Sequence, residues 1–519
     1  MAWASLSTTL GNKPHVLAGP LLRRVTTEEA TVWLALRKPG TVDLTIYDGN
    51  AAILQGRRHT VAIGRNLHIV AVTADKALPP FTGTMAEGKI YQYDLTFAYD
   101  DHLSETLASA TGGASLAYAP YTRPSFCLPP SNLNALRILH GSCRIPHGNG
   151  PDTLPIIDDL ILQMAANPDM RPHQLLMTGD QIYADDVGYA MSMMVNDAAE
   201  ALLGWSEVVP INLPPFGPTK VADLSPALRE HALAETAGFT SEDLVGHLVG
   251  LGEYLAMYLF VWSDVPWPAT GTALPAFAEV ANYFASREPG IFSELGYRQV
   301  RYEDAKAIDA QTARTQDFRS KLGAVRRALA NIPSYMIFDD HEVTDDWNMT
   351  RRICTGIYGS DLGLRVVQNA LTAYAVCQHW GNVPDDFGMS RMDFAESGTC
   401  TVTPDTFRFT LRKDKLRQTR RREGCRALPP DRCRTGTSWS WSAARAWRPL
   451  RGSGHHGGWG RCRAGCRSSR ACRRRRCRTS AAAERRTRGR QRIPTATPGR
   501  NVRRGARAPA SARRTVDRG

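Results

Sequence analysis

Apolar and polar side chains alternate in short runs through residues 15–120. In the run 91–99, aromatic or apolar residues stand at every odd position, with Gln, Asp, Thr and Ala between them. The runs 31–36, 43–47 and 68–73 are also rich in β-forming residues and lie between Gly, Asp and Asn turns. A period of two residues places every second side chain on the same face of a strand. We therefore predict an N-terminal β-sandwich of the immunoglobulin or fibronectin type.

The pattern changes after residues 121–134, a proline-rich segment that we interpret as a linker. Through residues 135–411, short apolar runs alternate with longer helix-compatible stretches, which predicts a layered domain of the α/β class. Residues 190–330 are mostly helix-compatible, and we expect a helical insertion that covers a central sheet. The predicted strands of that sheet are Leu136–His140, Gln174–Thr178 and Tyr335–Phe338.

The most apolar stretch, 244–262, is predicted to be a buried helix and not a membrane span. His247 and Glu253 interrupt it, and Ser241 before it is a typical N-cap residue. Residues 1–19 show no basic leader followed by an apolar stretch, so we expect a cytoplasmic protein without a secretion signal. The five cysteines before residue 412 should then be mostly free thiols.

Charge divides the chain into two very different parts. Residues 412–519 hold 34 of the 64 Lys and Arg residues but only 5 acids, so residues 1–411 carry 30 basic against 45 acidic residues. The basic part contains 32 Arg, 2 Lys, six cysteines and no Phe, Tyr or Met, so it cannot build a core and we expect it to be disordered. A GC-rich gene read out of frame yields this composition, which suggests a frame shift near residues 412–420. A genuine basic tail and a nucleic-acid-binding arm are the alternatives.

All three predicted strands of the α/β region end abruptly at polar residues. In layered α/β sheets the carboxyl ends of the strands meet at one edge, where sites form. We therefore expect a thiol, several carboxylates, a phenol and an imidazole to meet there. The sequences at the three ends are Gly141-Ser142-Cys143-Arg144, Gly179-Asp180-Gln181-Ile182-Tyr183 and Asp339-Asp340-His341-Glu342.

Such a group of acids and a thiolate requires cations, because like charges repel strongly in a region of low dielectric constant. Aspartate, thiolate and phenolate donors suit Fe(III), and a bridging carboxylate would hold a second divalent ion beside it. Two adjacent metal ions activate water and stabilise the charge of an in-line displacement at phosphorus. The strand ends therefore predict a hydrolase of phosphate esters.

These strand ends together resemble the motifs of the alkaline phosphatase D (PhoD-like) branch of the calcineurin-like metallophosphatases. The resemblance spans about residues 15–410 and includes a β-sandwich before the catalytic domain. It implies that Cys143 and Tyr183 bind a ferric ion and that Asp180 bridges two metal ions. Asp340 stands where the wider superfamily has a metal-binding Asn, and His341 would contact the phosphate or the leaving group. The second ion implied by the family is Ca(II), although relatives use Zn, Mn or another iron.

The chain also departs from the family pattern. Ala184 replaces the acid that often follows the tyrosine, with Asp185 and Asp186 just beyond. The downstream Asp and His ligands are not visible, since later histidines occur only at His379 and in the Gly-rich segment at 455–456. We therefore expect the chain as written to be catalytically impaired.

Each motif also has a purely structural interpretation. Cys143 could fill a small gap in the core, and Tyr183 could be a core aromatic residue. Gly179 could be a simple turn residue, and the acids at 339–342 could begin a helix.

The other polar residues near the strand ends are less informative. Arg144 could hold a phosphate oxygen, and His147 faces the same edge as Cys143. His140, His173 and His379 are expected to have structural roles.

Three classes of function remain at this stage. The first is a metal-dependent phosphomonoesterase or phosphodiesterase that acts on a small phosphate ester. The second is an inactive phosphatase-like binding or scaffold protein. The third, which we rank last, is a nucleic-acid-binding protein that uses the Arg-rich tail. We expect no membrane partner.

Overall fold

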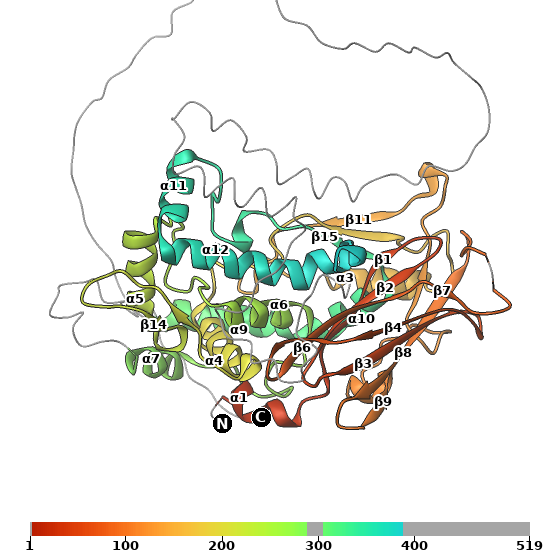
Figure 1. Ribbon diagram of the computed structural model, residues 1–519, viewed down its shortest axis with the longest axis horizontal. Coiled ribbons are helices and arrows are strands. Elements are labelled where there is room, and N and C mark those ends of the chain that lie inside the picture. Colours follow the sequence, from red (N-terminus) through yellow and green to blue (C-terminus); the bar gives the residue numbers. More distant parts are fainter. Residues whose placement is uncertain (1–2, 82, 288–304, 388–519) are drawn as a thin grey trace, which may run out of the picture. The chain divides into compact units, whose positions relative to one another are not determined.

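The structure is a computed structural model that describes residues 3–81, 83–287 and 305–387. These residues belong to a single compact unit, Met1–Pro449. They form antiparallel sheets, one parallel sheet and many helices (Figure 1), which confirms a mixed α/β architecture. Residues 388–411 and the Arg-rich segment 412–519 lie outside the described residues, so the predictions for those segments are not tested here.

Two antiparallel sheets form the N-terminal part of the molecule. The first has the strand order β1-β2-β6-β5, and the second has the order β10-β8-β3-β4-β7 with β9 paired to β8. The strands of the first sheet are β1 (Val16–Val25), β2 (Ala30–Leu36), β5 (Val61–Gly64) and β6 (Leu67–Ala74). Those of the second are β3 (Gly40–Asp48), β4 (Ala51–His59), β7 (Lys76–Ala77), β8 (Ile90–Tyr99), β9 (Ser104–Thr106) and β10 (Ser125–Cys127).

Packing of the first sheet explains why β2 is apolar along its whole length. All seven residues of β2 are buried, because the sheet is covered on both faces. Val32 and Leu34 share a core cluster with Leu44 and Leu95 of the second sheet, whereas Trp33 on the opposite face belongs to the cluster of the helices. Strand β3 alternates buried and half-buried residues, as a strand with one covered face should.

The segment interpreted as a linker, 121–134, contributes strand β10 to the second sheet. The two regions of the chain are also joined by buried hydrogen bonds. The Trp33 indole donates to the Val376 carbonyl (2.7 Å), and the Tyr93 hydroxyl donates to the Ala330 carbonyl (2.7 Å). The fully buried Arg23 guanidinium donates to the carbonyls of Ser334 and Gln378.

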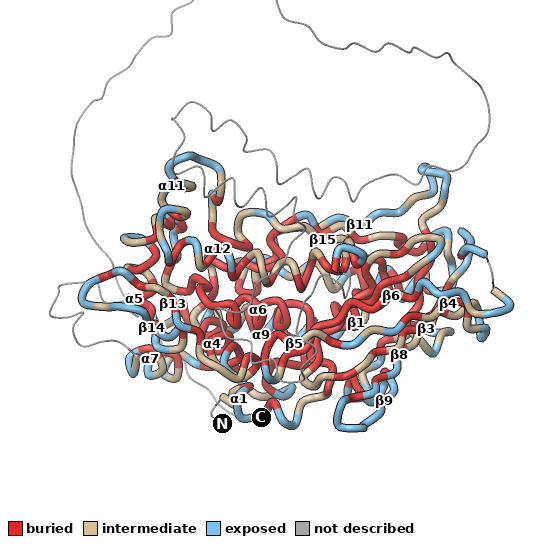
Figure 2. Tube along the Cα trace, viewed as in Figure 1, coloured by how far each residue is buried: buried red, intermediate tan, exposed pale blue. Residues whose placement is uncertain are grey.

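A small parallel sheet, ordered β11-β12-β15, carries the three predicted strand ends. Its register pairs Gly141 with Met177 and Met177 with Met336, so the three strands end at the same level. One face packs into the core through Leu175, Met177 and Met336, whereas Ile138 on the other face is 41% exposed. In Figure 2, strand β11 has the colours of exposed and half-buried residues. The strands are β11 (Ile138–Gly141), β12 (Gln174–Met177) and β15 (Ser334–Met336).

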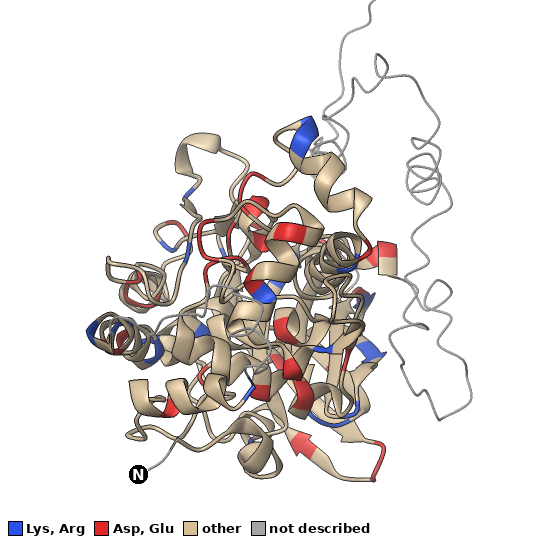
Figure 3. Cartoon of the chain, turned by 90° about the vertical axis from the view of Figure 1, so that its left-hand side faces the viewer, with Lys and Arg blue, Asp and Glu red and all other residues tan. Residues whose placement is uncertain are grey.

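Helices fill most of the remaining described chain, in agreement with the helix-compatible pattern of residues 190–330. Acidic and basic positions are interspersed over the helical end of the molecule (Figure 3). Among the described residues, no helix has both the length and the apolar character needed to cross a bilayer. The α-helices of four residues or more among the described residues are α1 (Leu6–Thr9), α2 (Leu107–Ala110), α3 (Ile156–Met164), α4 (Tyr189–Leu203), α5 (Pro226–His231), α6 (Leu251–Trp262), α7 (Phe277–Ala285), α9 (Ala305–Ser320), α10 (Leu322–Asn331), α11 (Arg351–Gly359) and α12 (Asp361–Tyr374).

One helix boundary differs from the prediction. The buried helix expected over 244–262 begins only at Leu251, with Gly250 as its N-cap. All twelve residues of α6 are buried, so the prediction of a buried helix is confirmed. Ser241 does not cap it, because its hydroxyl is bonded to side chains at the strand ends.

Candidate metal centre

The three strand ends meet, as the sequence predicted. Beyond the paired strands, the Cys143 amide donates to the Gly179 carbonyl (3.3 Å) and the Arg144 amide donates to the Asp180 carbonyl (3.0 Å). The Ala184 amide donates to the His341 carbonyl (2.8 Å), which ties the third strand end to the second. The loops that follow β11, β12 and β15 therefore form one connected edge.

Backbone strain is concentrated at this edge. Cys143 and Asp180 have φ values of 57° and 51°, which non-glycine residues seldom adopt. Gly179 has a φ of 144°, and a Cβ atom added there would lie 2.5 Å from the Cβ of Asp339. Glycine is therefore required at this position both for its φ value and for the close approach of the two loops. Such strain is often found where a site holds side chains in a fixed arrangement.

Asp180 is the central residue of the edge. Its side chain is 4% exposed, and its Oδ1 atom is buried without a hydrogen-bond partner. Burial raises the pKa of this carboxyl, and the nearby Asp339 and Asp340 charges raise it further. Carboxylate oxygens of Asp180, Asp339 and Asp340 all lie within 4.8 Å of one another. A buried acceptor without a donor, beside two further acids, is destabilising unless a cation binds there.

Cys143 and Tyr183 also contact Asp180. The Tyr183 hydroxyl donates to Asp180 Oδ2 (3.4 Å), and the Cys143 thiol interacts with both side chains. Cys143 is an exposed free thiol, so it does not fill a gap in the core. Burial, followed by the charge of Asp180, raises the pKa of Tyr183, so its phenolate would form only beside a cation.

This donor set fits two metal ions. The Cys143 thiol and the Tyr183 hydroxyl contact the Asp180 side chain, and oxygens of Asp339 and Asp340 lie within 4.8 Å of an Asp180 oxygen. Asp180 therefore belongs to both sets of donors. The carboxylates of Asp180, Asp339 and Asp340 could hold a metal ion.

His341 is held by a buried carboxylate. Its Nδ1 atom donates to Asp185 Oδ1 (2.9 Å), and its ring stacks on Tyr183 with 4.4 Å between the ring centroids. The hydrogen bond to Asp185 raises the pKa of His341 to about 9, against the opposing effect of burial. The imidazole is 26% exposed and therefore accessible from the site. In the metal-free protein, this pKa favours the protonated imidazole at neutral pH.

Asp185 is in turn fixed by two further donors. The Ser241 hydroxyl donates to its Oδ2 atom (2.8 Å), and so does the Asp345 amide (2.6 Å). Burial raises the pKa of the Asp185 carboxyl, but the hydrogen bond from His341 and the nearby His247 outweigh burial and bring the pKa below its usual value. Asp185 therefore remains ionised and keeps the His341 ring oriented.

A second group of acids adjoins the first. Oxygens of Asp340, Asp345 and Asp346 lie within 4.8 Å of one another, and Asp340 belongs to both groups. The Asp346 amide donates to Asp340 Oδ2 (3.0 Å), which fixes the orientation of that carboxylate. No histidine belongs to either group within the described part of the chain.

Glu342, the last residue of the third motif, does not face the metal site. It is 1% exposed, and its two oxygens accept four N–H donors from the surrounding loops. Burial raises the pKa of Glu342 to about 8, against the effect of these bonds. Four donors leave no acceptor for a carboxyl proton, so the contacts are those of the ionised form.

Arg144 is engaged elsewhere in the structure. Its guanidinium forms an ion pair with Asp152 (2.7 Å), donates to the Val261 carbonyl and lies 4.3 Å over the Phe318 ring. Its side chain is 8% exposed. Contact with phosphate would require these bonds to break, so we leave Arg144 out of the proposed catalytic set.

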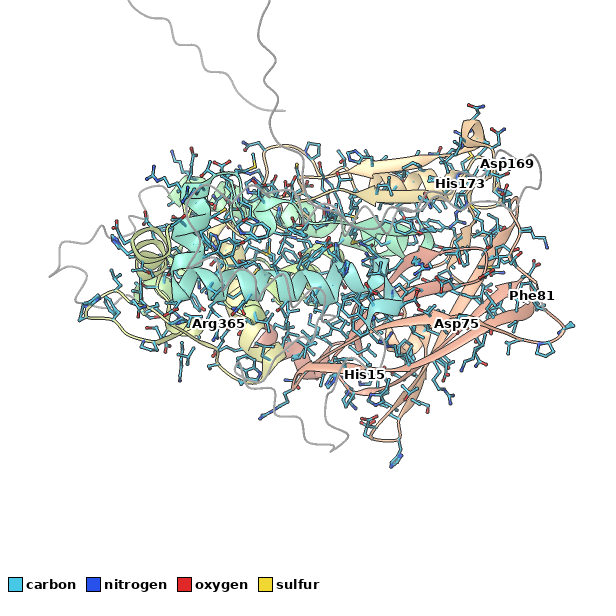
Figure 4. The ribbon with its side chains drawn as sticks, turned by 45° about the horizontal axis from the view of Figure 1, so that its top comes forward. His15, Asp75, Phe81, Asp169, His173 and Arg365 are labelled. Carbon is cyan, nitrogen blue, oxygen red and sulfur yellow. The ribbon has the colours of Figure 1, made fainter. Side chains whose placement is uncertain are left out.

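The other histidines named from the sequence have protein partners. His147 is buried and bonded to Asp186 (3.1 Å), whereas the exposed His140 is bonded to Thr178 (2.7 Å). His173, labelled in Figure 4, lies directly before β12, and its Nδ1 atom accepts the Arg137 amide (3.0 Å). Asp180 follows the other end of that strand. His379 is half-buried against aromatic rings at the end of the π-helix Ala375–His379, which follows α12.

Several important residues were not assigned from the sequence. Asp339 belongs to a recognised motif, but the family resemblance directs attention to Asp340. Asp185 was noted only as an acid after Tyr183, and Asp345 carried no signal beyond its charge. Ser241 could not have been found, because its contact with Asp185 spans 56 residues of sequence.

Comparisons with known proteins leave the family open. The chain matches no family model, and no curated protein matches it. Among solved structures, it is similar to PhoD with 11% identity, over 69% of this chain and 46% of that chain, at a TM-score of 0.28. The chain thus spans less than half the length of that structure.

Two further solved structures show similar levels of likeness. A purple acid phosphatase from yellow lupin (Lupinus luteus) seeds has 11% identity over 36% of this chain and 32% of its own, at a TM-score of 0.21. A cycloisomaltooligosaccharide glucanotransferase from Paenibacillus sp. has 13% identity over 36% and 26%, at 0.16. Two of the three structures are phosphatases, but similarity at these TM-scores does not assign a function to this chain.

Proposed function

We propose that this protein is a phosphoric ester hydrolase with a binuclear metal centre of the PhoD-like type. The observation that carries the proposal is the buried, unpartnered Oδ1 atom of Asp180 at the meeting point of three strand ends. Cys143, Asp180 and Tyr183 would hold an iron ion. Asp180 and Asp340 would hold a divalent ion, Ca(II) by family resemblance, with Asp339 as a further oxygen donor.

Such a centre suits chemistry at phosphorus. When bound, the two ions would lower the pKa of water and neutralise the charge on the phosphoryl oxygens. His341 supplies a proton to the departing alkoxide from Nε2, because Asp185 occupies its Nδ1 atom and the Asp345 carboxylate lies 3.8 Å from Nε2, beyond hydrogen-bond distance. Asp185 is a positioning residue that keeps the imidazole charged and oriented.

The sequence-based organisation of the chain is part of this proposal. We assign residues 15–120 to a β-sandwich and residues 135–411 to the catalytic region, in a cytoplasmic protein. The reading frame would be lost near residues 412–420, and the nucleotide sequence around residues 405–425, read in all three frames, tests this.

The competing function is that of an inactive phosphatase-like binding protein. It is favoured by one observation, that neither acid group within the described residues includes a histidine. Metal analysis distinguishes the two functions, since an inactive remnant would lack a full pair of ions.

The decisive experiment combines metal analysis with hydrolysis of p-nitrophenyl phosphate and bis(p-nitrophenyl) phosphate. We expect iron and a divalent ion to bind, a visible absorption band from the Tyr183 phenolate on iron, and hydrolysis of at least one ester. Metal content and activity should both be lower in the chain as written than in a chain restored to the other reading frame. Tyr183→Phe should lose the band. His341→Ala should keep near-normal metal content while kcat falls by roughly 10². Metal-free protein without activity after reconstitution would establish the competing function instead.

A further inference from the structure

Glu342 joins two of the strand ends that carry the metal-binding acids. Its Oε2 atom accepts the amides of Asp180 (3.0 Å) and Asp339 (2.8 Å). Its Oε1 atom accepts the Gln181 amide (2.8 Å) and the side-chain amide of Gln378 (3.2 Å). One buried carboxylate therefore bonds the loop after β12 and the loop after β15 at the same time.

These bonds continue the link between β12 and β15 beyond the last backbone hydrogen bond that joins the two strands. The last backbone bond between the two strands runs from the Ile337 amide to the Met177 carbonyl (3.0 Å). Beyond it, the positive φ values of Gly179 and Asp180 turn the chain away from regular pairing. The Glu342 carboxylate takes up the amides that the ladder no longer pairs.

We propose that Glu342 is a positioning residue of the metal centre, which sets the spacing between Asp180 and the pair Asp339–Asp340 without touching metal or substrate. Three acids within 4.8 Å of one another repel, so the loops need a restraint before any ion binds. Groups behind the ligands commonly change metal affinity by about 10–100-fold. This inference rests on the proposed binuclear site.

Glu342→Gln tests the role, because the new NH₂ group must face two N–H donors whichever way the amide is turned. The matched control is Glu253→Gln, at another buried carboxylate that accepts two backbone amides, those of Val249 (2.7 Å) and Gly250 (2.9 Å). Glu253 is also 1% exposed and pairs with Arg229, outside the metal site. Both changes should lower the Tm of the full-length chain, so loss of stability alone does not separate the two roles.

The separating measurement is titration of metal-free protein with Mn²⁺, with bound and free ion followed by electron paramagnetic resonance. Glu342→Gln should weaken Mn²⁺ binding by about 10-fold or more, and Glu253→Gln by less than about 3-fold. Equal Mn²⁺ affinity in both variants would overturn the inference and leave the proposed function standing. Wild-type protein that binds no Mn²⁺ would overturn both.

A gentler variant covers the case in which Glu342→Gln does not fold. Gln378→Met removes one donor to Glu342 and leaves its three backbone bonds in place. We expect about 2–5-fold weaker Mn²⁺ binding, on the reduced scale of one lost restraint. Unchanged affinity in Gln378→Met, with Glu342→Gln unfolded, would count against Glu342 as a positioning residue of the metal site.

Discussion

The first antiparallel sheet and the small parallel sheet differ in how completely they are covered. Strand β2 is buried at every residue, between one core formed with the second sheet and another formed with the helices. Strand β11 instead alternates exposed and half-buried residues, and its sheet ends in acids at close range. Within the described ranges, four of the five non-glycine residues with positive φ lie in the loops beyond the parallel strands. Stability is thus concentrated in one sheet and strain in the other, as expected when a site is supported by a rigid scaffold.

Asp180→Ala should give the largest contrast between the two regions. It removes the bridging carboxylate, so we expect both metal ions to be lost and hydrolysis to fall by about 10³-fold or more. The metal-free protein should be as stable as wild type or more so, because a buried acceptor without a donor has been removed. Metal analysis and thermal unfolding check both parts.

Leu44→Ala in β3 should have the opposite effect, a loss of stability without a loss of metal. Leu44 is fully buried between the antiparallel sheets, so we expect a loss of about 2–5 kcal/mol of stability with unchanged metal content. If Asp180→Ala releases only one ion, Asp180 is not a bridge.

Gly179→Ala tests whether strain at the parallel strand ends serves the site. An added Cβ would lie 2.5 Å from that of Asp339, so the two acid-bearing loops should separate. We expect a loss of about 1–3 kcal/mol of stability and roughly 10-fold weaker Mn²⁺ binding.

The control is Gly49, in the turn between β3 and β4. It also has a positive φ, of 60°, but a Cβ atom added there meets nothing within 4 Å. Gly49→Ala should therefore cost about 1 kcal/mol and leave Mn²⁺ binding unchanged; similar weakening in both variants would contradict the comparison.

Asp185→Asn should alter the pH dependence of the metal-free protein. The folded state raises the pKa of His341 from 6.5 to about 9, so it holds that proton more tightly than the unfolded chain. The resulting stabilisation is complete below pH 6.5 and is lost as the pH rises through about 9. In Asp185→Asn the pKa of His341 should fall toward its ordinary value, and this part of the pH dependence should disappear. Titration of the imidazole by NMR and Tm measured from pH 6.5 to 9 test it.

A surface pair in the antiparallel region is the control for that prediction. His59 contacts Asp100 at 3.0 Å, with both side chains about half exposed at 47% and 51%. Asp100→Asn should change stability by less than about 0.5 kcal/mol, because exposed ion pairs contribute little. If it changed the pH dependence as much as Asp185→Asn, burial of Asp185 would not be the cause.

Ile138→Lys should have the smallest effect. Ile138 is 41% exposed on the less covered face of the parallel sheet, so we expect a change in stability of less than about 0.5 kcal/mol. A charge on this edge strand should also reduce aggregation, measured by light scattering. The same substitution at Val70, which is fully buried in β6, should prevent folding; tolerance of Lys at Val70 would show that the antiparallel core is less closely packed than the structure indicates.

Much of the architecture could be predicted from local pattern. The alternation over 91–99 predicted β8, and the apolar runs before Gly141, Gly179 and Asp339 predicted the parallel strands. The start of α6 was wrong by seven residues, because Ser241 has the features of an N-cap residue but is bonded across the fold to Asp185. Arg144 likewise had the chemistry of a phosphate ligand, yet Asp152 and Phe318 hold it elsewhere.

By itself, the sequence determined which residues reach the strand ends, because strand periodicity and the polar residues that stop each strand are local properties. Only the tertiary structure decided what those residues contact. The bond between Asp185 and His341 spans 156 residues, and the bond between Glu342 and the Asp180 amide spans 162. No pattern along the chain encodes such partners, since they are set by the packing of whole elements. The same packing leaves Asp180 Oδ1 buried without a donor, and that single atom is the strongest sign of a metal site.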